Sequence, residues 1–256
     1  MGTRWGTWRP RTRLGHAGDM GWGWRVTALA VVVGCVVWVE AGTSLSHDDY
    51  RAAVDSAAAR ANREINDRWA AKPLTDLPPQ LPWAEWAEPR TREVCEVDYA
   101  TEFGARNPGT ITCRMTYSRT AGFDGDFLTR IGEADAAGRA LGWLEGGSVL
   151  RSSVEYYRIT EAQAGKVDAG TVPAVSYLVP APAPGTTGCT SPGYIGESWV
   201  ERSNELSGRF GEWPSAGALF ERSSGPLPQA TATDLLSRHR YVMAFTLGTE
   251  CRLKVG

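Results

Sequence analysis

The most apolar part of the chain is a nearly uninterrupted run at residues 26–39, close to the N-terminus. As a helix this run spans only about 21 Å, whereas the hydrocarbon core of a bilayer is ~30 Å thick. The helix can continue to residue 45, which brings about 20 residues into the membrane. Tryptophans, which favour membrane interfaces, flank the run: Trp22, Trp24 and Trp38. The pattern therefore predicts a single transmembrane anchor over residues 26–45.

Two other interpretations of this segment stay open. The run also has the length of the apolar part of a signal peptide, and Val39-Glu40-Ala41 is a tolerable cleavage site, after which the mature chain begins at Gly42. Residues 32–35 resemble a bacterial lipobox that ends in a cysteine, although apolar residues follow that cysteine. In all three cases the arginine-rich residues 1–25 form a cytoplasmic tail by the positive-inside rule, and the remainder of the chain is extracytoplasmic.

Residues 48–71 show the spacing of an amphipathic helix. Apolar side chains recur every three or four positions, at Tyr50, Val54, Ala57, Ala61, Ile65 and Trp69. Ser46 and the acids that follow it offer N-caps, and Pro73 ends the predicted helix. The helix can continue from the anchor as a stalk. Its apolar stripe is expected to pack on the chain's own domain, with self-association as the alternative.

Residues 73–89 contain five prolines and predict an extended linker. A proline-rich sequence of this kind also suits a peptide ligand of another protein. The favoured interpretation is a linker that lies over the domain with Trp83 and Trp86 inserted into it. Residues 46–89 are therefore expected to form a helical stalk and a Pro/Trp-rich linker ahead of the domain.

The clearest alternation of apolar and polar residues follows the linker. The apolar members are Cys95, Val97 and Tyr99 in one run and Ile111, Cys113, Met115 and Tyr117 in the next. Residues 104–109 between them are rich in turn formers. If the two strands pair antiparallel with Cys95 opposite Cys113, then Val97 faces Ile111, and all apolar side chains share one face. The hydrophobic pattern and the cysteine positions thus predict the same register.

Helices and strands are interspersed beyond this hairpin. Asp124-Gly125-Asp126 leads into a predicted helix whose apolar stripe begins at Phe127 and that ends at Gly142. The other expected elements are strands at 154–160 and 174–179 with a loop at 165–173 between them, a strand or helix at 195–202, a short helix at 230–238, and a closing hairpin of 241–247 and 251–255 turned at Gly248. This order predicts an α+β domain over residues 90–256, with helices packed on a mainly antiparallel sheet.

Four cysteines lie in the part predicted to be exported: Cys95, Cys113, Cys189 and Cys251. An even number in an extracytoplasmic segment predicts two disulfides. The hairpin register pairs Cys95 with Cys113, which leaves Cys189 for Cys251, while Cys35 stays free in the membrane run. None of them has the Cys-x-x-Cys spacing of a zinc or thioredoxin-type site, so structural disulfides are expected and a metal site is not.

Composition bears on compartment and partners. The chain has 256 residues, 42% of them hydrophobic, so it can build a sizeable core. Its formal net charge is −2, and no overall positive field attracts nucleic acid. The basic and aromatic residues 8–13 are expected to meet anionic lipid headgroups. The expected partners are membrane lipid, through residues 22–45, and another protein of the envelope.

No catalytic motif appears in the sequence. GxSxG, SxxK, HExxH, GxGxxG and P-loop sequences are all missing. The exported part holds two histidines, His47 and His239, and a packed or surface His239 is favoured over a member of a catalytic triad. Asp124-Gly125-Asp126 resembles a fragment of a calcium loop, but the helix that follows leaves too few ligands, so a helix cap by Asp124 or Asp126 is predicted.

Paired carboxylates are the remaining catalytic candidate. Glu96, Asp98 and Glu102 could serve glycoside cleavage, although a solvated strand face predicts the same residues. We therefore expect a non-enzymatic, membrane-tethered extracytoplasmic domain that binds a partner, an envelope component or a signal, without cofactors. An accessory or immunity protein of an exported system falls in the same class. The alternative is a small cell-envelope hydrolase that uses paired carboxylates.

Overall fold

The computed structural model describes residues 45–99, 106–147, 149–180, 193–202, 210 and 218–255. They belong to one compact unit, Leu45–Gly256. Within these residues no helix is long and apolar enough to cross a membrane. Residues 1–44 lie outside the described residues. They include the predicted tail at 1–25 and all but the last residue of the predicted anchor at 26–45, so the anchor stays a prediction.

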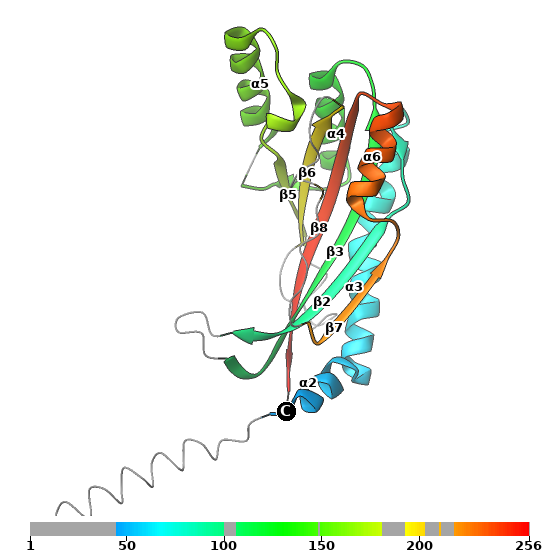
Figure 1. Ribbon diagram of the computed structural model, residues 1–256, viewed down its shortest axis with the longest axis vertical. Helices are drawn as coiled ribbons and strands as arrows, with labels where there is room; N and C mark the ends of the chain where they lie inside the picture. The colour runs from blue at the N-terminus through cyan, green and yellow to red at the C-terminus, as the bar shows by residue number, and fades with distance from the viewer. Residues whose placement is uncertain are drawn as a thin grey trace, which may run out of the picture. The chain divides into compact units, whose positions relative to one another are not determined.

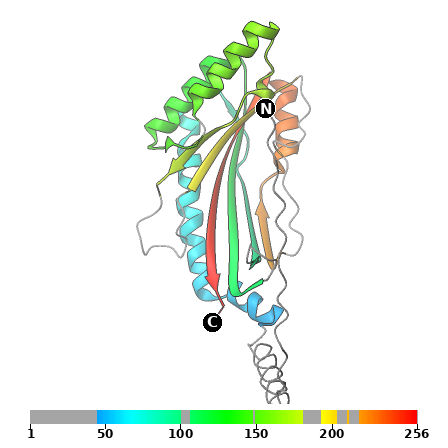
Figure 2. The same ribbon diagram turned by 90° about the vertical axis from the view of Figure 1, so that its left-hand side faces the viewer.

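The centre of the domain is a mainly antiparallel sheet, which confirms the α+β class (Figures 1 and 2). The strand order is β4-β5-β6-β8-β3-β2-β7, and β1 pairs with β3 beside this path. The strands are β1 (Glu85–Trp86), β2 (Arg90–Tyr99), β3 (Arg106–Phe123), β4 (Leu144–Glu145), β5 (Val175–Val179), β6 (Gly193–Glu201), β7 (Phe220–Ser224) and β8 (Tyr241–Lys254).

The predicted hairpin is confirmed in β2 and β3. Cys95 lies opposite Cys113 and Val97 opposite Ile111, in the register that the alternation required. Cys95 and Cys113 form a disulfide. Since a shift of one residue would turn every apolar side chain to the other face, burial of this face fixes the pairing.

The predicted single helix at 48–71 is wrong in detail, because two helices occupy this region. α2 (His47–Val54) begins with a capping box at Ser46, and α3 (Ala57–Asp76) begins at Ser56, whose side chain accepts a bond from the Ala59 amide. A serine cap in mid-segment restarts the helix by satisfying free N–H groups. Pro73 lies inside α3 and does not end it. The buried Leu74 and Leu77 beyond it hold the last turn on the core.

The proline-rich residues 73–89 are more regular than an extended linker. They complete α3 and then form a 3₁₀ turn (Pro78–Gln80) and strand β1. Both tryptophans are inserted as predicted. Trp83 packs edge-on against Phe123 at 5.7 Å between ring centres, and Trp86 lies 6.0 Å from Phe245. Because of these contacts, the segment expected as stalk and linker belongs to the same compact unit as the sheet.

Two helices follow β3. α4 (Phe127–Ala140) has Asp126, one of the two predicted candidates, as its N-cap, and Gly142 with φ 85° lies just past its end. The strand predicted at 154–160 is wrong, because these residues lie in α5 (Leu150–Ala164). The β-branched and aromatic residues there suggested a strand. Their packing is helical, since Leu150, Val154 and Tyr157 contact the core at a spacing of three and four.

The closing hairpin is also wrong, because β8 runs without a turn from Tyr241 to Lys254. Gly248 lies in mid-strand, opposite Thr116 on β3 and Tyr194 on β6. β3 pairs with β8 along its whole length and β6 pairs with it up to Gly248, and these two ladders hold the glycine extended. The ambiguous segment at 195–202 lies mostly in β6. The strand predicted at 174–179 (β5) and the helix predicted at 230–238, α6 (Pro228–Arg238), are confirmed.

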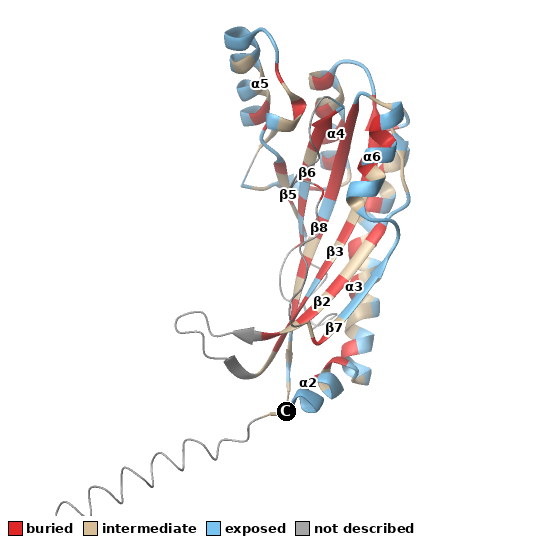
Figure 3. Ribbon diagram, in the orientation of Figure 1, coloured by how far each residue is buried: buried red, intermediate tan, exposed pale blue. Residues whose placement is uncertain are grey.

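Helices cover both faces of the sheet (Figure 3). Alternation along β8 directs Met243 and Phe245 into the main core, where α3 and α4 pack. Val242 and Ala244 face the other way, into a second cluster with Leu235 of α6. The lower half of the main face, between α3 and the ends of β2, β3 and β8, contains the candidate site described next.

Candidate functional site

α2, the first turns of α3 and the end of β8 line an open groove of about 380 Å³. Its helical wall is made of small side chains, at Ala52, Ala53, Ala58 and Ala59, and its strand wall includes Leu253 and Val255. Because alanine reaches only one carbon beyond the backbone, the two helices leave space above the strand. The hydroxyl of Tyr50 accepts a hydrogen bond from the Gly109 amide at 3.3 Å and ties α2 to β3 beside the groove.

A smaller chamber, of about 10 Å³, continues the groove inward. Ala59, Asn62 and Leu253 line both spaces. The chamber is about large enough for one water molecule. Its inner wall contains polar and sulfur groups rather than the aliphatic carbon of an ordinary core: Asn66, Glu93, Cys113, Met115 and Cys251. A groove that narrows to converging polar groups is the usual form of a ligand site.

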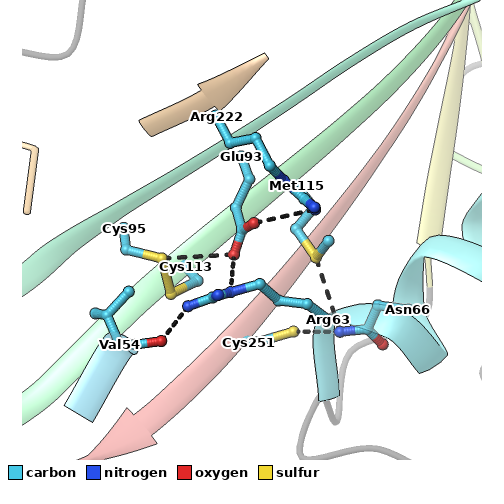
Figure 4. The surroundings of a disulfide bond; sticks show 9 residues. All are labelled: Val54, Arg63, Asn66, Glu93, Cys95, Cys113, Met115, Arg222 and Cys251. Atoms are coloured by element: carbon cyan, nitrogen blue, oxygen red, sulfur yellow. Dashed lines mark hydrogen bonds and ion pairs between the residues drawn. A yellow bond between two sulfur atoms is a disulfide. The ribbon is translucent and has the colours of Figure 1, made fainter. Parts of the chain in front are cut away.

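Glu93 is the charged group at the base of this site (Figure 4). It lies on β2 at an inward position and is only 2% exposed. Arg63 of α3 holds one carboxylate oxygen at 2.8 Å, and Arg222 of β7 lies 3.3 Å from the other without hydrogen-bond geometry. Burial raises the pKa of Glu93 more than the two guanidinium groups lower it.

The two arginines are fixed by further contacts. Arg63 stacks on the Phe220 ring at 4.6 Å and donates to the carbonyl of Val54 at the end of α2. Arg222 donates to Asp67 at 3.1 Å, and Asp67 also accepts a bond from the hydroxyl of Tyr117. Two cations and two carboxylates thus form one charge-balanced network that joins α3 to β2 and β7, with Glu93 buried and the Asp67–Arg222 pair partly exposed.

Sulfur atoms lie directly beside Glu93. The Cys95 sulfur is 3.7 Å from Glu93 Oε1. Asn66, which is 1% exposed, directs its amide nitrogen to the Cys251 sulfur at 2.9 Å and to the Met115 sulfur at 3.8 Å. These contacts lie side by side in Figure 4. The site therefore combines a buried carboxyl group, a disulfide and an amide donor that points at sulfur.

Glu93, Cys95 and Cys113 bring three possible metal-binding atoms within 4.8 Å of one another. A metal ion does not fit them in the observed state. The two sulfurs are joined in a disulfide and have no thiolate to offer, and two arginines already neutralise the carboxylate.

Among the described residues the structure shows one disulfide, Cys95–Cys113. Cys189 lies outside the described residues, so the second predicted disulfide, Cys189–Cys251, stays a prediction. Cys251 lies on β8 directly opposite Cys113.

His239 has a carboxylate beside each of its ring nitrogens. Its Nδ1 lies 2.8 Å from Asp124 and its Nε2 lies 2.8 Å from Glu85, so both ring nitrogens are occupied. A catalytic base needs one nitrogen free for the nucleophile. Burial lowers the pKa of His239, but the two carboxylates outweigh it and raise the pKa overall. The ring packs so closely over Gly122 that a Cβ there would lie 2.3 Å from it.

The acids of Asp124-Gly125-Asp126 have separate partners. Asp126 caps α4 by accepting the Thr129 amide at 2.8 Å, as predicted. Asp124 instead accepts the Arg240 amide at 2.8 Å and holds His239, and these bonds lower its pKa. Both carboxylates therefore have hydrogen-bond partners within the protein, and this geometry favours the helix-cap interpretation over a calcium site.

Of the three carboxylates proposed for glycoside cleavage, the structure describes the side chain of Glu96 alone. Glu96 pairs with Arg114 at 3.4 Å on the outward face. The side chain of Asp98, and Glu102 as a whole, lie outside the described residues. The alternation in β2 places Glu93 inward with Cys95 and Val97, so the inward position of this acid follows from the sequence pattern.

A second glutamate lies inward by the same alternation. Glu197 lies on β6 between Ile195 and Trp199 in the alternation and is fully buried. The hydroxyl of Tyr177 lies 3.0 Å from Glu197 and 3.1 Å from Asp135. A hydroxyl has one proton and can donate to only one of them. Burial raises the pKa of Glu197 to about 8, so this residue is the neutral acid of the pair at neutral pH.

No family model, curated protein or solved structure matches the chain.

Proposed function

We propose that the chain is a membrane-tethered extracytoplasmic domain that binds a partner or envelope component in the groove between α2, α3 and β8, without catalysing a reaction. In this proposal residues 26–45 anchor the chain, residues 22–45 contact membrane lipid, and residues 1–25 stay in the cytoplasm. The domain from residue 46 onward lies outside the membrane.

The observation that carries the proposal is the buried Cys95–Cys113 disulfide. Disulfides persist in exported proteins, whereas cytosolic thiols are kept reduced. The arginine-rich N-terminus followed by an apolar run supports the same compartment from the sequence. These two arguments are independent, because one rests on the pairing of strands and the other on charge beside the apolar run.

Binding is favoured over catalysis by the state of the ionisable groups. Both nitrogens of His239 are occupied, and Tyr177 and other buried side chains enclose Glu197. Of the described residues that line the outer groove, Asp49 is the acid, and it serves the capping box of α2. A hydrolase with two carboxylates facing one cleft has no support in this part of the chain.

Reporter fusions test the topology. Alkaline phosphatase, which requires an oxidising compartment to fold, is fused in a bacterium after residue 25, after residue 46 and at the C-terminus. We expect activity from the second and third fusions alone. An active fusion after residue 25, or an inactive C-terminal fusion that is expressed at full length, contradicts the proposal.

Site-specific photocrosslinking in the same cells tests the groove. A photoreactive residue replaces Ala52 on the groove wall, and the matched control replaces the exposed Glu155 on α5. We expect a discrete adduct from position 52 that position 155 does not give. Equal crosslinking from both positions speaks against the groove as the binding surface.

A further inference from the structure

The chamber at the inner end of the groove contains an acceptor with unused hydrogen-bonding capacity. The carboxylate of Glu93 forms part of the chamber wall and is 2% exposed. Arg63 holds Oε1 at 2.8 Å, whereas Oε2 has no hydrogen-bond partner among the described residues. A carboxylate has about four acceptor sites on its two oxygens, and a buried polar atom without a partner is costly. A group that enters the chamber and donates a hydrogen bond is therefore stabilised there.

The size and charge of the chamber limit what this donor can be. The volume of about 10 Å³ admits a group about as large as one water molecule. The surrounding network is already balanced, with Arg63 and Arg222 beside Glu93 and Asp67 beside Arg222. An ammonium group would be a third cation here and a carboxylate a third anion, and each would lose its hydration on entry. A hydroxyl group is small, neutral and a donor, and thus meets all three conditions.

The outer groove indicates what carries this hydroxyl. Most of its lining side chains are small or aliphatic, at Ala52, Ala53, Ala58, Ala59, Leu253 and Val255. Two polar members serve the helix caps, since Ser56 accepts the Ala59 amide and Asp49 accepts the Ser46 hydroxyl. The charged members, Asp49 and Lys254, are exposed to solvent. A slim aliphatic stem therefore suits these walls better than a charged or branched one.

We propose that the groove and chamber bind a primary aliphatic alcohol. Its hydroxyl donates to Glu93 in the chamber, and its chain lies between the alanines of α2 and α3 and the end of β8. Asn62 and Arg63, in the chamber wall, carry N–H groups that can donate to the hydroxyl oxygen. The proposal rests on the proposed function, because it specifies the chemistry of the ligand for the same groove.

Methionine methyl signals report on the chamber directly. The chain has four methionines, Met1, Met20, Met115 and Met243. Met115 lines the chamber, whereas Met243 is fully buried in the core and is not part of that lining. The full-length protein, with isotope-labelled methionine methyl groups and in detergent micelles, is titrated with 1-butanol, and Met115→Leu assigns the signal. We expect a saturable shift of the Met115 signal and none of the Met243 signal. Absence of a Met115 shift overturns the proposal.

Probes of similar size separate the hydroxyl donor from simple filling of the groove. Methyl propyl ether is an isomer of 1-butanol without the O–H group, while butylammonium and butyrate carry a charge. Each should bind about tenfold or more weakly than 1-butanol, as expected for loss of a hydrogen bond to a buried carboxylate. Equal affinity for any of these three probes contradicts recognition of a hydroxyl. Equal affinity for N-acetylserine methylamide, a hydroxyl on a peptide, contradicts the aliphatic stem.

A substitution at the passage between groove and chamber tests the position of the hydroxyl. Asn62 lines both spaces, and Asn62→Leu keeps Glu93 while narrowing the passage. The matched control is Ala61→Leu, at an exposed position of α3. An unchanged Met243 signal shows that each variant is folded. We expect Asn62→Leu alone to lose the Met115 shift; a shift that survives in Asn62→Leu, or is lost in both variants, overturns the binding mode.

The outcome can be told apart from that of the proposed function. Photocrosslinking from position 52 reports whether a partner occupies the groove in cells, whereas the titration uses purified protein and reports only which chemistry the chamber accepts. A crosslinked partner together with equal binding of butanol and the ether leaves the proposed function standing and refutes the alcohol. Selective binding of butanol without a crosslink supports the alcohol and speaks against the partner.

Discussion

Glu93 and Glu197 occupy inward strand positions that apolar residues take elsewhere in the sheet. Each is buried, but their neighbours differ. Glu93 faces the guanidinium groups of Arg63 and Arg222, which favour its charged form. Glu197 faces the hydroxyl of Tyr177, and its other carboxyl oxygen has no hydrogen-bond partner among the described residues. Since an isolated buried charge is costly, protonation of Glu197 is the less unfavourable state.

Replacement of Glu197 by glutamine should stabilise the domain at neutral and alkaline pH. The folded pKa of about 8 lies above the unfolded value, so the folded state holds a proton that the unfolded state loses above about pH 4.5. Stability therefore falls as pH rises from about 4.5 to 8, with a limiting slope of about 1.4 kcal/mol per pH unit. In Glu197→Gln this slope should be absent.

Urea denaturation at pH 5, 6.5 and 8 measures the effect. The midpoint for Glu197→Gln should exceed that of the wild type by an amount that grows with pH. Glu155→Gln, an exposed change on α5, serves as the control and should follow the wild type. A variant that is destabilised equally at all three values would falsify the neutral-acid assignment.

His239 should stabilise the folded domain most at acidic pH, where its imidazole is protonated. Its folded pKa is raised above the unfolded value of about 6.5. The contribution is therefore fully present below about pH 6.5 and is lost as pH rises through the folded pKa. On the acid side it is lost when Glu85 and Asp124, whose pKa values are lowered by bonds to this histidine and to the backbone, become protonated.

The expected result for His239→Gln is a lower urea midpoint at pH 5.5 and a smaller difference from wild type at pH 9. His47→Gln, at the exposed start of α2, is the matched control. If the loss is larger at pH 9 than at pH 5.5, the histidine is not held as a cation between its two carboxylates.

At the scale of elements, the predictions from sequence are correct where the local pattern of a segment suits the strand or core on which that segment packs. The β2–β3 hairpin follows from period-two alternation and a turn, and α4 follows from a cap and a helical stripe. Prediction failed where tertiary contacts outweigh local preference. α5 contains strand-favouring residues but packs by its helical face, and Gly248 stays extended because β8 has strands on both sides.

The candidate site was predictable only in part, for a related reason. The pairing of Cys95 with Cys113 was read from alternation on one face. The same alternation places Glu93 inward, but an acid at an inward position is uninformative until its partners are known. Those partners come from α3 and β7, far away in the chain. The groove depends on the break between α2 and α3, which the cap at Ser56 makes. In the sequence, nothing distinguishes this serine from one inside a continuous helix.

The cap of α4 offers a test at this scale. Asp126→Ala should lower the free energy of unfolding by about 0.5–2 kcal/mol, because the Thr129 amide loses its acceptor. Asp124→Ala should instead weaken the pH dependence attributed to His239. Calcium at millimolar concentration should change the melting temperature of neither variant nor of the wild type. If calcium raises the melting temperature of the wild type and Asp126→Ala abolishes this rise, the loop is a metal site, because a ligand that binds the folded state raises the melting temperature of the protein.

At the scale of the whole molecule, the charge-balanced network under the groove joins the first helices of the domain to its central and edge strands. Arg63 connects the end of α2 to β2, and Arg222 connects α3 to β7. The groove lies where the described chain begins, since Leu45 is part of its lining.

The fate of the N-terminal segment can be settled by the mass of the intact protein extracted from membranes. The apolar run is short for a bilayer on its own, but the interfacial tryptophans and the continuation to residue 45 favour an uncleaved anchor. The expected mass is therefore that of the full chain. Cys35→Ser should change the mass only by the difference between the two side chains. The variant should remain in the membrane fraction in the same amount as the wild type. A chain that begins at Gly42, or a lipid adduct that Cys35→Ser removes, means that the segment is processed and that the anchor prediction is wrong. The disulfide argument for an extracytoplasmic domain would stand in either case, because a cleaved signal and a lipidated cysteine deliver the same residues to the same side.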